Sequence, residues 1–401
     1  MSDVPHLRFP EFSGEWECST IGREFELYSG NTPSRLDKEQ FNGNVNWISS
    51  GELKEHYIYD TKEKITEEAA SCNNLRLLPI GTFVIAIYGL EAEGVRGTGS
   101  VIQKKSTISQ ACMAFSSKGT ITNEFLYSWY KKHGNLIGLK YAQGTKQQNL
   151  SYDIISQFRI SYPSITEQKK LQDFISLIDE RIATQNKIIE KLESLIEGLN
   201  NSLYDRYGDG IRTSFAGLGY SYSGLSGKSA MDFGKGKPFI TYLNVYSNNV
   251  VNENDYQYVQ IDEGEKQNVV QYGDVLFTLS SETPEEVGIG SVYLGQDEVY
   301  LNSFCFGIHI VNEELAYSPY ISYYVSSTPF RKFIYPFAQG STRFNLCKAD
   351  FEKASITLPS LDNQKRIHLV LNSVAMKIST ERAMLEQYVT QKQYLLRQMF
   401  I

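Results

Sequence analysis

The sequence predicts an α+β fold in which two β-rich modules are separated by two long helices that pair as an antiparallel coiled coil. Three observations predict this fold. The stretch YAQGTKQQNL at 141–150 returns as FAQGSTRFNL at 337–346, so the chain contains an internal repeat. A long stretch with the apolar spacing of a coiled coil follows each copy. The regions before the two copies hold short apolar runs bounded by Gly, Asn and Asp, which are typical of strands.

Length and composition agree with two domains. The chain has 401 residues, of which 41% are hydrophobic and 21% charged, as in folded globular proteins. The first residues show no signal-peptide pattern, and no stretch approaches the roughly 18 apolar residues of a membrane span, so we expect a cytoplasmic protein. The five cysteines lack CxxC spacing, which favours reduced thiols over disulfides or a zinc site.

The repeat divides each half of the chain into a variable part and a constant part. A shift of 196 positions aligns residues 141–204 with 337–400 without a gap. Upstream the similarity is weaker: YSG at 28 returns at 222, WISSGEL at 47 resembles FITYLNV at 239, IGTFVIAI at 80 resembles YGDVLFTL at 272, and GSVIQ at 99 resembles GSVYL at 290. The gap-free window repeats Gln143, Gly144, Asn149, Leu150, Pro163, Ser164, Gln168 and Lys169 as Gln339, Gly340, Asn345, Leu346, Pro359, Ser360, Gln364 and Lys365.

The constant part is helical, because its apolar residues step by alternating threes and fours. The seam of the first helix consists of Leu171, Ile175, Ile178, Ile182, Ile189, Leu192, Ile196, Leu199 and Leu203. The seam of the second helix includes Ile367, Leu371, Val374, Ile378, Leu385 and Leu395. Such stripes need a partner, and the two helices provide one for each other. We expect them to run antiparallel, because PSITEQ and PSLDNQ start each helix at its own module. The predicted domains are 1–162 and 207–358 for the modules, and 163–206 and 359–401 for the helices.

Catalytic motifs are missing from the sequence. SGLSGKSA at 223–230 lacks the first glycine of a phosphate-binding loop, and RGTGSV at 96–101 lacks a third glycine and predicts a turn. The histidines show no metal-binding spacing, and no GxSxG nucleophile motif occurs. We therefore expect a non-catalytic chain that binds no metal or cofactor itself.

Several of these stretches resemble one known family. VPHLRFPEFSGEW near the start, GNTPSR at 30, WISSGEL at 47, AQGTKQQNLS at 142 and YPSITEQKKL at 162, together with the duplicated end, resemble a specificity subunit of a type I restriction-modification system over essentially the whole chain. The resemblance implies two target-recognition domains that read the two halves of an asymmetric, bipartite site on double-stranded DNA. It also implies two methyltransferase subunits and two restriction subunits as partners, which would carry S-adenosylmethionine, ATP and Mg and perform the chemistry.

The net charge of −7 favours a competing hypothesis, because phosphate binding needs clustered Lys and Arg. The chain could instead be a scaffold whose modules bind protein, with the coiled coil setting the distance between them, and which does not read DNA. Under the resemblance, methyltransferase subunits that clamp the duplex would supply phosphate contacts, and this chain would mainly contact base edges.

Candidate DNA contacts lie where side chains change within a repeated frame. In the first loop the residues that change are Lys146, Gln147 and Gln148. The second loop has Thr342, Arg343 and Phe344 at the same three positions. Arg343 is the best single candidate, because the contact of Arg with guanine is the commonest specific contact. The alternative interpretation of the repeated loop is a turn that only caps the module and does not contact DNA. Further candidates are Arg96, Lys104, Lys105 and Gln110 on a basic loop between two strands, for which a solvated hairpin is the favoured alternative, and Lys235, Lys237 and Thr241 in the second module.

Overall fold

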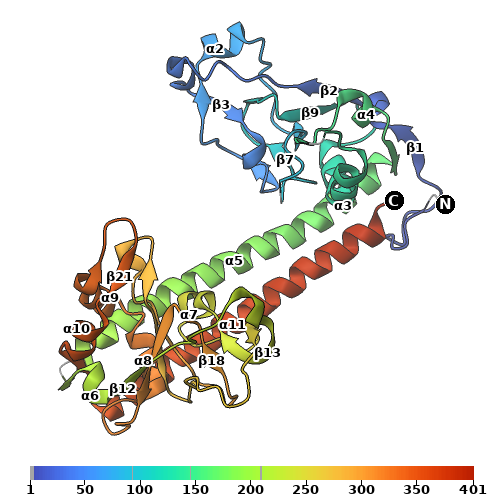
Figure 1. Cartoon of the computed structure of the whole chain (residues 1–401). Coiled ribbons are helices and arrows are strands. Elements are labelled where there is room, and N and C mark those ends of the chain that lie inside the picture. The colour runs from blue at the N-terminus through green and yellow to red at the C-terminus, as the bar shows by residue number, and fades with distance from the viewer. Residues whose placement is uncertain (1–3, 93, 145, 208–209) are drawn as a thin grey trace. The chain divides into compact units, whose positions relative to one another are not determined.

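The computed structural model describes residues 4–92, 94–144, 146–207 and 210–401 (Figure 1). It divides into two compact units, which are residues 1–185 with 384–401 and residues 186–383. Each unit contains one β-rich module, part of the first long helix and part of the second. Within the described ranges, no helix is long and apolar enough to cross a membrane.

The main sheet of unit 1 has five strands in the order β2 (Phe25–Ser29), β9 (Cys112–Ser117), β6 (Phe83–Ala86), β7 (Gly99–Ile102) and β4 (Tyr57–Ile58). Its neighbours are antiparallel except for β4, which joins β7 in parallel. A second sheet pairs β3 (Val45–Ile48) with β5 (Lys64–Ile65) and, in parallel, with β8 (Ser106–Ile108). The remaining elements are the pair β1 (Glu17–Thr20) and β10 (Arg159–Tyr162), and helices α1 (Ile21–Glu24), α2 (Glu67–Cys72), α3 (Asn123–Tyr141) and α4 (Tyr152–Ser156).

Unit 2 repeats this plan. Its main sheet has the order β12 (Gly219–Ser223), β19 (Cys305–Ile310), β15 (Val275–Thr278) and β17 (Gly290–Val292), and all neighbours are antiparallel. A second sheet pairs β13 (Phe233–Ile240) with β14 (Tyr256–Val259) and, in parallel, with β18 (Tyr300–Leu301). The remaining elements are β11 (Ile211–Thr213) with β22 (Ile356–Leu358), β16 (Ser280–Ser281) with β21 (Phe344–Leu346) and β20 (Ala338–Gln339), and helices α6 (Phe215–Leu218), α7 (Tyr242–Ser247), α8 (Ser318–Tyr324), α9 (Thr328–Ile334) and α10 (Lys348–Lys353).

Four strands of the main sheet and all three of the second sheet have the same order in both units, and unit 1 adds β4 to its main sheet. The shared order confirms the duplication and the mixed helix and sheet fold. The weak sequence echoes fall on equivalent strands: β6 and β15 lie in the stretches beginning at 80 and 272, and β7 and β17 in those beginning at 99 and 290. The short strands between Gly and Asn punctuation are those that the apolar runs predicted.

The two long helices are α5 (Ile165–Tyr207, green in Figure 1) and α11 (Leu361–Met399, red). Every predicted seam residue is buried or half-buried. In unit 1 the start of α5 packs against the end of α11, because Leu171 and Ile175 share a core with Leu396 and Met399. In unit 2 the end of α5 and the start of α11 share the other large core, where Leu199 packs near Ile367. The helices therefore run antiparallel within each unit, as predicted.

A buried glutamine fastens the start of α5 to the module that precedes it. The Gln168 amide donates to the backbone oxygens of Thr120 and Pro163, at 2.9 Å each, and its Oε1 accepts from the backbone N–H of Thr122 at 2.9 Å. The side chain is fully buried, so these three bonds satisfy a polar group that would otherwise be costly to bury.

The start of α11 repeats the attachment. The Gln364 amide donates to the backbone oxygens of Leu315 and Pro359, at 2.8 Å each, and accepts from the backbone N–H of Tyr317 at 2.8 Å. The recurrence of this glutamine in the sequence thus has a structural reason in both units.

Candidate nucleic-acid interface

One edge of the main sheet of unit 1 gathers four loops. Because the strands are antiparallel, the C-terminal ends of β2 and β6 lie beside the N-terminal ends of β9 and β7. We call the loops at this end the loop edge of unit 1. They are residues 30–32, 87–92, 94–98, 109–111, 143–144 and 146–149.

The corresponding end of the main sheet in unit 2 is where β12 and β15 end and β19 and β17 begin. The loops there form the loop edge of unit 2. They are residues 224–226, 279–289, 302–304 and 339–345.

Backbone hydrogen bonds hold the loops of unit 1 together. The N–H of Gly30 donates to the oxygen of Cys112 at 3.4 Å, and that of Ile87 donates to the oxygen of Ala111 at 2.9 Å. The N–H of Leu150 then donates to the oxygen of Ile87 at 2.9 Å. The repeated loop is thereby attached to the end of β6.

The same set of bonds occurs in unit 2. Gly224 donates to Cys305 at 3.2 Å, Leu279 donates to Phe304 at 2.9 Å, and Leu346 donates to Leu279 at 2.8 Å. These bonds involve only main-chain atoms, so both loop edges share one backbone frame while their side chains differ.

The repeated phrase is the part of this frame that needs glycine. Gly144 has φ +118° and Gly340 has φ +143°, and a Cβ at either position would overlap a carbonyl oxygen, that of Gln147 or of Arg343. Glycine is the residue that tolerates such a backbone. In unit 1 the loop is closed by two bonds between Gln143 and Asn149, at 2.9 and 2.8 Å, and Gln339 pairs with Asn345 in the same way.

The predicted contacts in the first module fall into two groups. Lys146, Gln147 and Gln110 are exposed on the loop edge of unit 1. Gln148 is half-buried there, and its Oε1 accepts from the guanidinium of Arg96 at 3.4 Å. The structure therefore brings these five residues to one edge.

Lys104 and Lys105 form the other group, because they lie at the opposite end of the main sheet. They are exposed in the turn after β7, and the Lys104 ammonium lies 3.7 Å from the Asp60 carboxylate. The hairpin reading of this stretch is wrong, since β7 and β8 belong to different sheets and pair with other strands.

In the second module, Thr342 and Arg343 are exposed on the loop edge of unit 2. Lys235 and Lys237 are exposed on β13 of the second sheet instead, where Lys237 lies 3.4 Å from a carboxylate oxygen of Glu298. The Thr241 hydroxyl accepts from the N–H of Asn244 at 3.1 Å and so caps α7, which gives this residue a structural role.

Phe304 lies on the loop edge of unit 2 but was not among the predicted contacts. Its ring is 56% exposed, and the Arg343 guanidinium lies 5.9 Å from the ring centroid. Sequence patterns place apolar residues inside by default, which is why this residue was missed. Aligning the two modules strand by strand could have found it, because Phe304 corresponds to Ala111 in the shared frame.

Several titratable groups are buried within the two sheets. Within the described part of the chain, no group of three His, Cys, Asp or Glu side chains is placed to hold a metal ion. Burial raises the pKa of the Cys112 thiol to about 12, so it stays protonated and unreactive at neutral pH. Asp274 accepts from the Tyr222 hydroxyl and contacts His309 Nδ1, at 2.7 Å each, within the sheet of unit 2. These groups satisfy one another inside the fold.

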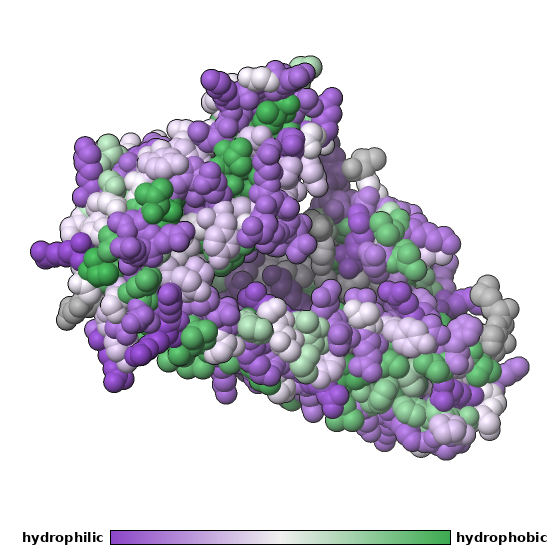
Figure 2. Space-filling model, turned by 90° about the horizontal axis from the view of Figure 1, so that it is seen from below, coloured by the Kyte–Doolittle hydropathy of each residue, from purple (hydrophilic) through white to green (hydrophobic). Residues whose placement is uncertain are grey.

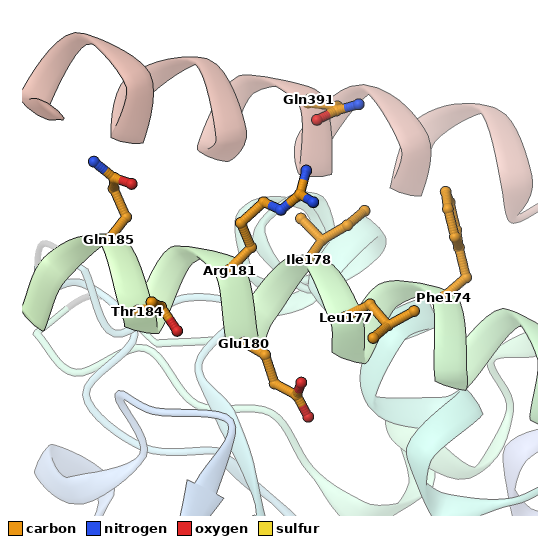
Figure 3. Close-up of a pocket in the computed structure, with 8 residues that line it drawn as sticks. All are labelled: Phe174, Leu177, Ile178, Glu180, Arg181, Thr184, Gln185 and Gln391. Atoms are coloured by element: carbon orange, nitrogen blue, oxygen red, sulfur yellow. The ribbon is translucent and has the colours of Figure 1, made fainter. Parts of the chain in front are cut away.

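A second surface lies on the helix pair of unit 1. A hollow between α5 and α11 is lined by Phe174, Leu177, Ile178, Glu180, Arg181, Thr184, Gln185 and Gln391 (Figure 3). Leu177 is 63% exposed, and the Arg181 guanidinium lies 5.5 Å from the Tyr388 ring centroid. The face in Figure 2 shows apolar residues in small patches between hydrophilic ones.

Two similar modules with variable loop edges, each attached to a long helix, define a duplicated recognition protein. A family model described as "Type I restriction modification DNA specificity domain" matches residues 13–194 and 228–388. The chain belongs to this family of type I restriction-modification DNA specificity domains.

Individual relatives agree with the family. The chain is 29% identical over 185 residues to the type I restriction enzyme MjaIX specificity subunit of Methanocaldococcus jannaschii, covering 44% of this chain and 42% of that protein. It is 28% identical over 207 residues to the EcoR124I/EcoR124II specificity subunit of Escherichia coli, covering 51% and 49%. The chain thus spans about half the length of the curated relatives it matches.

Solved structures share the fold over the full length. The S subunit of the type I restriction-modification system of M. genitalium superposes with a TM-score of 0.56 at 15% identity, covering 99% of both chains. A chain from a structural study of complex assembly and conformational transition in a type I R-M system superposes with a TM-score of 0.61 at 13% identity, covering 98% of both.

Proposed function

We propose that this chain is the DNA sequence-recognition subunit of a type I restriction-modification complex. Each module, at 1–162 and 207–358, would read one half of an asymmetric, bipartite site. The observation that carries the proposal is the pair of loop edges, in which one backbone frame presents different side chains in the two units. A fixed frame with variable side chains is what a protein needs to read different bases in the same geometry.

The side chains at the loop edges suit base recognition. Gln110 and Gln147 in unit 1 are exposed amides, which can bond both the N6 and N7 groups of adenine. Arg343 in unit 2 can bond O6 and N7 of guanine. The positive side chain of Arg96, which bonds the Gln148 amide, and that of the exposed Lys146 in the same loop edge can contact phosphates.

The proposal assigns the chemistry to partner subunits. Two methyltransferase subunits and two restriction subunits would bind this cytoplasmic chain, and they would carry S-adenosylmethionine, ATP and Mg. The hollow of Figure 3, with exposed Leu177, supports a protein contact on the helix pair. Partners that clamp the duplex would also explain how a chain with net charge −7 acts on DNA.

The test is to purify the full chain with its methyltransferase partner and sequence the duplexes that the complex retains from a random pool. We expect two unlike short motifs separated by a fixed gap. A stable complex that enriches no sequence would refute DNA recognition and support the protein-binding scaffold. Repeating the selection with the methyltransferase alone controls for any sequence preference of the partner.

A further inference from the structure

We propose that Phe304 reads a thymine methyl group in the half-site of the unit 2 module, next to a guanine read by Arg343. This inference rests on the proposed function, since it concerns which bases one loop edge selects. It goes beyond that function by assigning a chemical feature of the target to a residue.

Hydrogen bonds to the N–H and the carbonyl oxygen of Phe304 fix the backbone of its loop. Its N–H donates to the Asn302 side-chain oxygen at 2.9 Å, and its carbonyl oxygen accepts from the N–H of Leu279 at 2.9 Å. The N–H of the next residue, Cys305, donates to the backbone oxygen of Asn302 at 3.0 Å. The Phe304 residue, which is 56% exposed, therefore projects from a hydrogen-bonded loop. Rigid presentation lowers the entropy lost on binding.

Arg343 is the charged residue that lies beside the Phe304 ring. Its guanidinium lies 5.9 Å from the ring centroid, and its backbone belongs to the tight loop that Gly340 allows. Within the described residues, no ion pair occupies the guanidinium. An Arg that is not held by a carboxylate can bond the acceptors of a guanine. Bases along one strand are about 3.4 Å apart, so the two side chains suit neighbouring or next-neighbouring bases.

The chemistry of phenylalanine restricts what it can recognise. Its side chain has no hydrogen-bonding group, and the thymine methyl is the apolar feature that major-groove base edges present. The equivalent residue in unit 1 is Ala111, whose small side chain leaves the edge to amides such as Gln110. The two loop edges therefore differ in kind, with amides in unit 1 and an aromatic–Arg pair in unit 2.

The experiment uses the full chain in complex with its methyltransferase partner and a selected duplex. We expect the selection to enrich a thymine near a guanine in the unit 2 half-site. Replacing that thymine by deoxyuridine removes only the methyl group and should weaken binding about fourfold, the effect of one buried methyl-sized group. Phe304→Ala should bind both duplexes equally, and Arg343→Ala should relax the choice of guanine.

Tyr272→Ala is the matched control. Tyr272 is also 56% exposed, but it precedes β15 and so lies at the opposite end of the same sheet. We expect this variant to discriminate thymine from deoxyuridine like the wild type. Thermal unfolding of all variants checks that each remains folded.

The proposal is overturned if wild-type complexes bind the thymine and deoxyuridine duplexes equally, or if Phe304→Ala still prefers thymine. In both cases the bipartite motif itself would persist, so the proposed function would stand. Absence of any enriched motif would instead refute the function. Loss of methyltransferase from the Phe304→Ala complex would show that this surface binds protein, and would also overturn the proposal.

Discussion

His56 and Asp179 connect the β-rich module of unit 1 to α5, because the imidazole Nδ1 lies 3.4 Å from the Asp179 carboxylate. The other ring nitrogen lies 2.8 Å from Glu124 on α3. Asp179 also pairs with Lys392 on α11. The ring of Tyr127 stacks on the imidazole at 3.9 Å, so these charges meet in a partly dry environment.

This arrangement predicts that the stability of unit 1 depends on pH. Burial alone would lower the pKa of His56, but Asp179 and Glu124 outweigh burial and raise it above the ordinary value. The charged imidazole therefore stabilises the fold below about pH 6.5, and this contribution is lost as pH rises through the raised pKa. We expect the contribution of His56 to the free energy of unfolding in urea, taken as the difference between the wild type and His56→Gln, to fall from pH 6.0 to 7.5.

His56→Gln should remove this part of the slope. Burial lowers the pKa of the nearby Lys131 to about 8, so measurements stop at pH 7.5, before that lysine loses most of its charge. Equal slopes for the wild type and His56→Gln would show that the histidine is not the titrating group.

The loop glycines give a second prediction. Gly144→Ala and Gly340→Ala should each cost about 1–3 kcal/mol, because both place a Cβ against a carbonyl oxygen at positive φ. Each should also weaken selection of only its own half-site in the random-pool experiment. Gly51→Ala is the control, since a Cβ there meets open space, and its unfolding curve should match that of the wild type.

The attachment of α5 gives a third prediction. Gln168→Leu leaves two backbone oxygens and one N–H without their partner inside the protein, and we expect a loss of about 2–4 kcal/mol in the free energy of unfolding. The exposed Gln387→Leu should change stability by less than about 0.5 kcal/mol. Similar effects of the two substitutions would argue against the buried amide as an anchor.

Charge reversal at the loop edges gives a fourth prediction. Lys146→Glu should impair selection of one half-site and Arg343→Glu that of the other, because a carboxylate repels phosphate and cannot bond the guanine acceptors. Binding of the methyltransferase, measured by co-purification, should be unchanged. In each variant the unaffected half-site is the internal control. Loss of selection at both half-sites after one substitution would contradict the hypothesis that each module reads its own half-site.

The sequence predicted the parts of the fold that depend on local pattern. The seam from Leu171 to Leu203 follows from helical period, and the phrase around Gly144 and Gly340 marks a frame that tolerates no side chain. These features depend on single residues and on their spacing along the chain.

Pairing between distant strands was not predictable in the same way. Nothing local in the stretch from Arg96 to Gln110 shows that β7 and β8 join different sheets, which separates Lys104 from Arg96 in space. The exposed ring of Phe304 likewise depends on where β19 begins within its sheet. Such placements arise from tertiary contacts and override local preference.

The buried glutamines at the start of α5 and α11 have an evolutionary consequence. All six of their bonds reach main-chain atoms, so these six bonds do not depend on which side chains the module carries. A recombination event that replaced one module by a distant homologue would keep the joint at Gln168 or Gln364 intact. Exchange of whole gene segments would therefore keep this main-chain attachment, whereas side-chain contacts such as that of His56 with Asp179 would have to be matched by the incoming module.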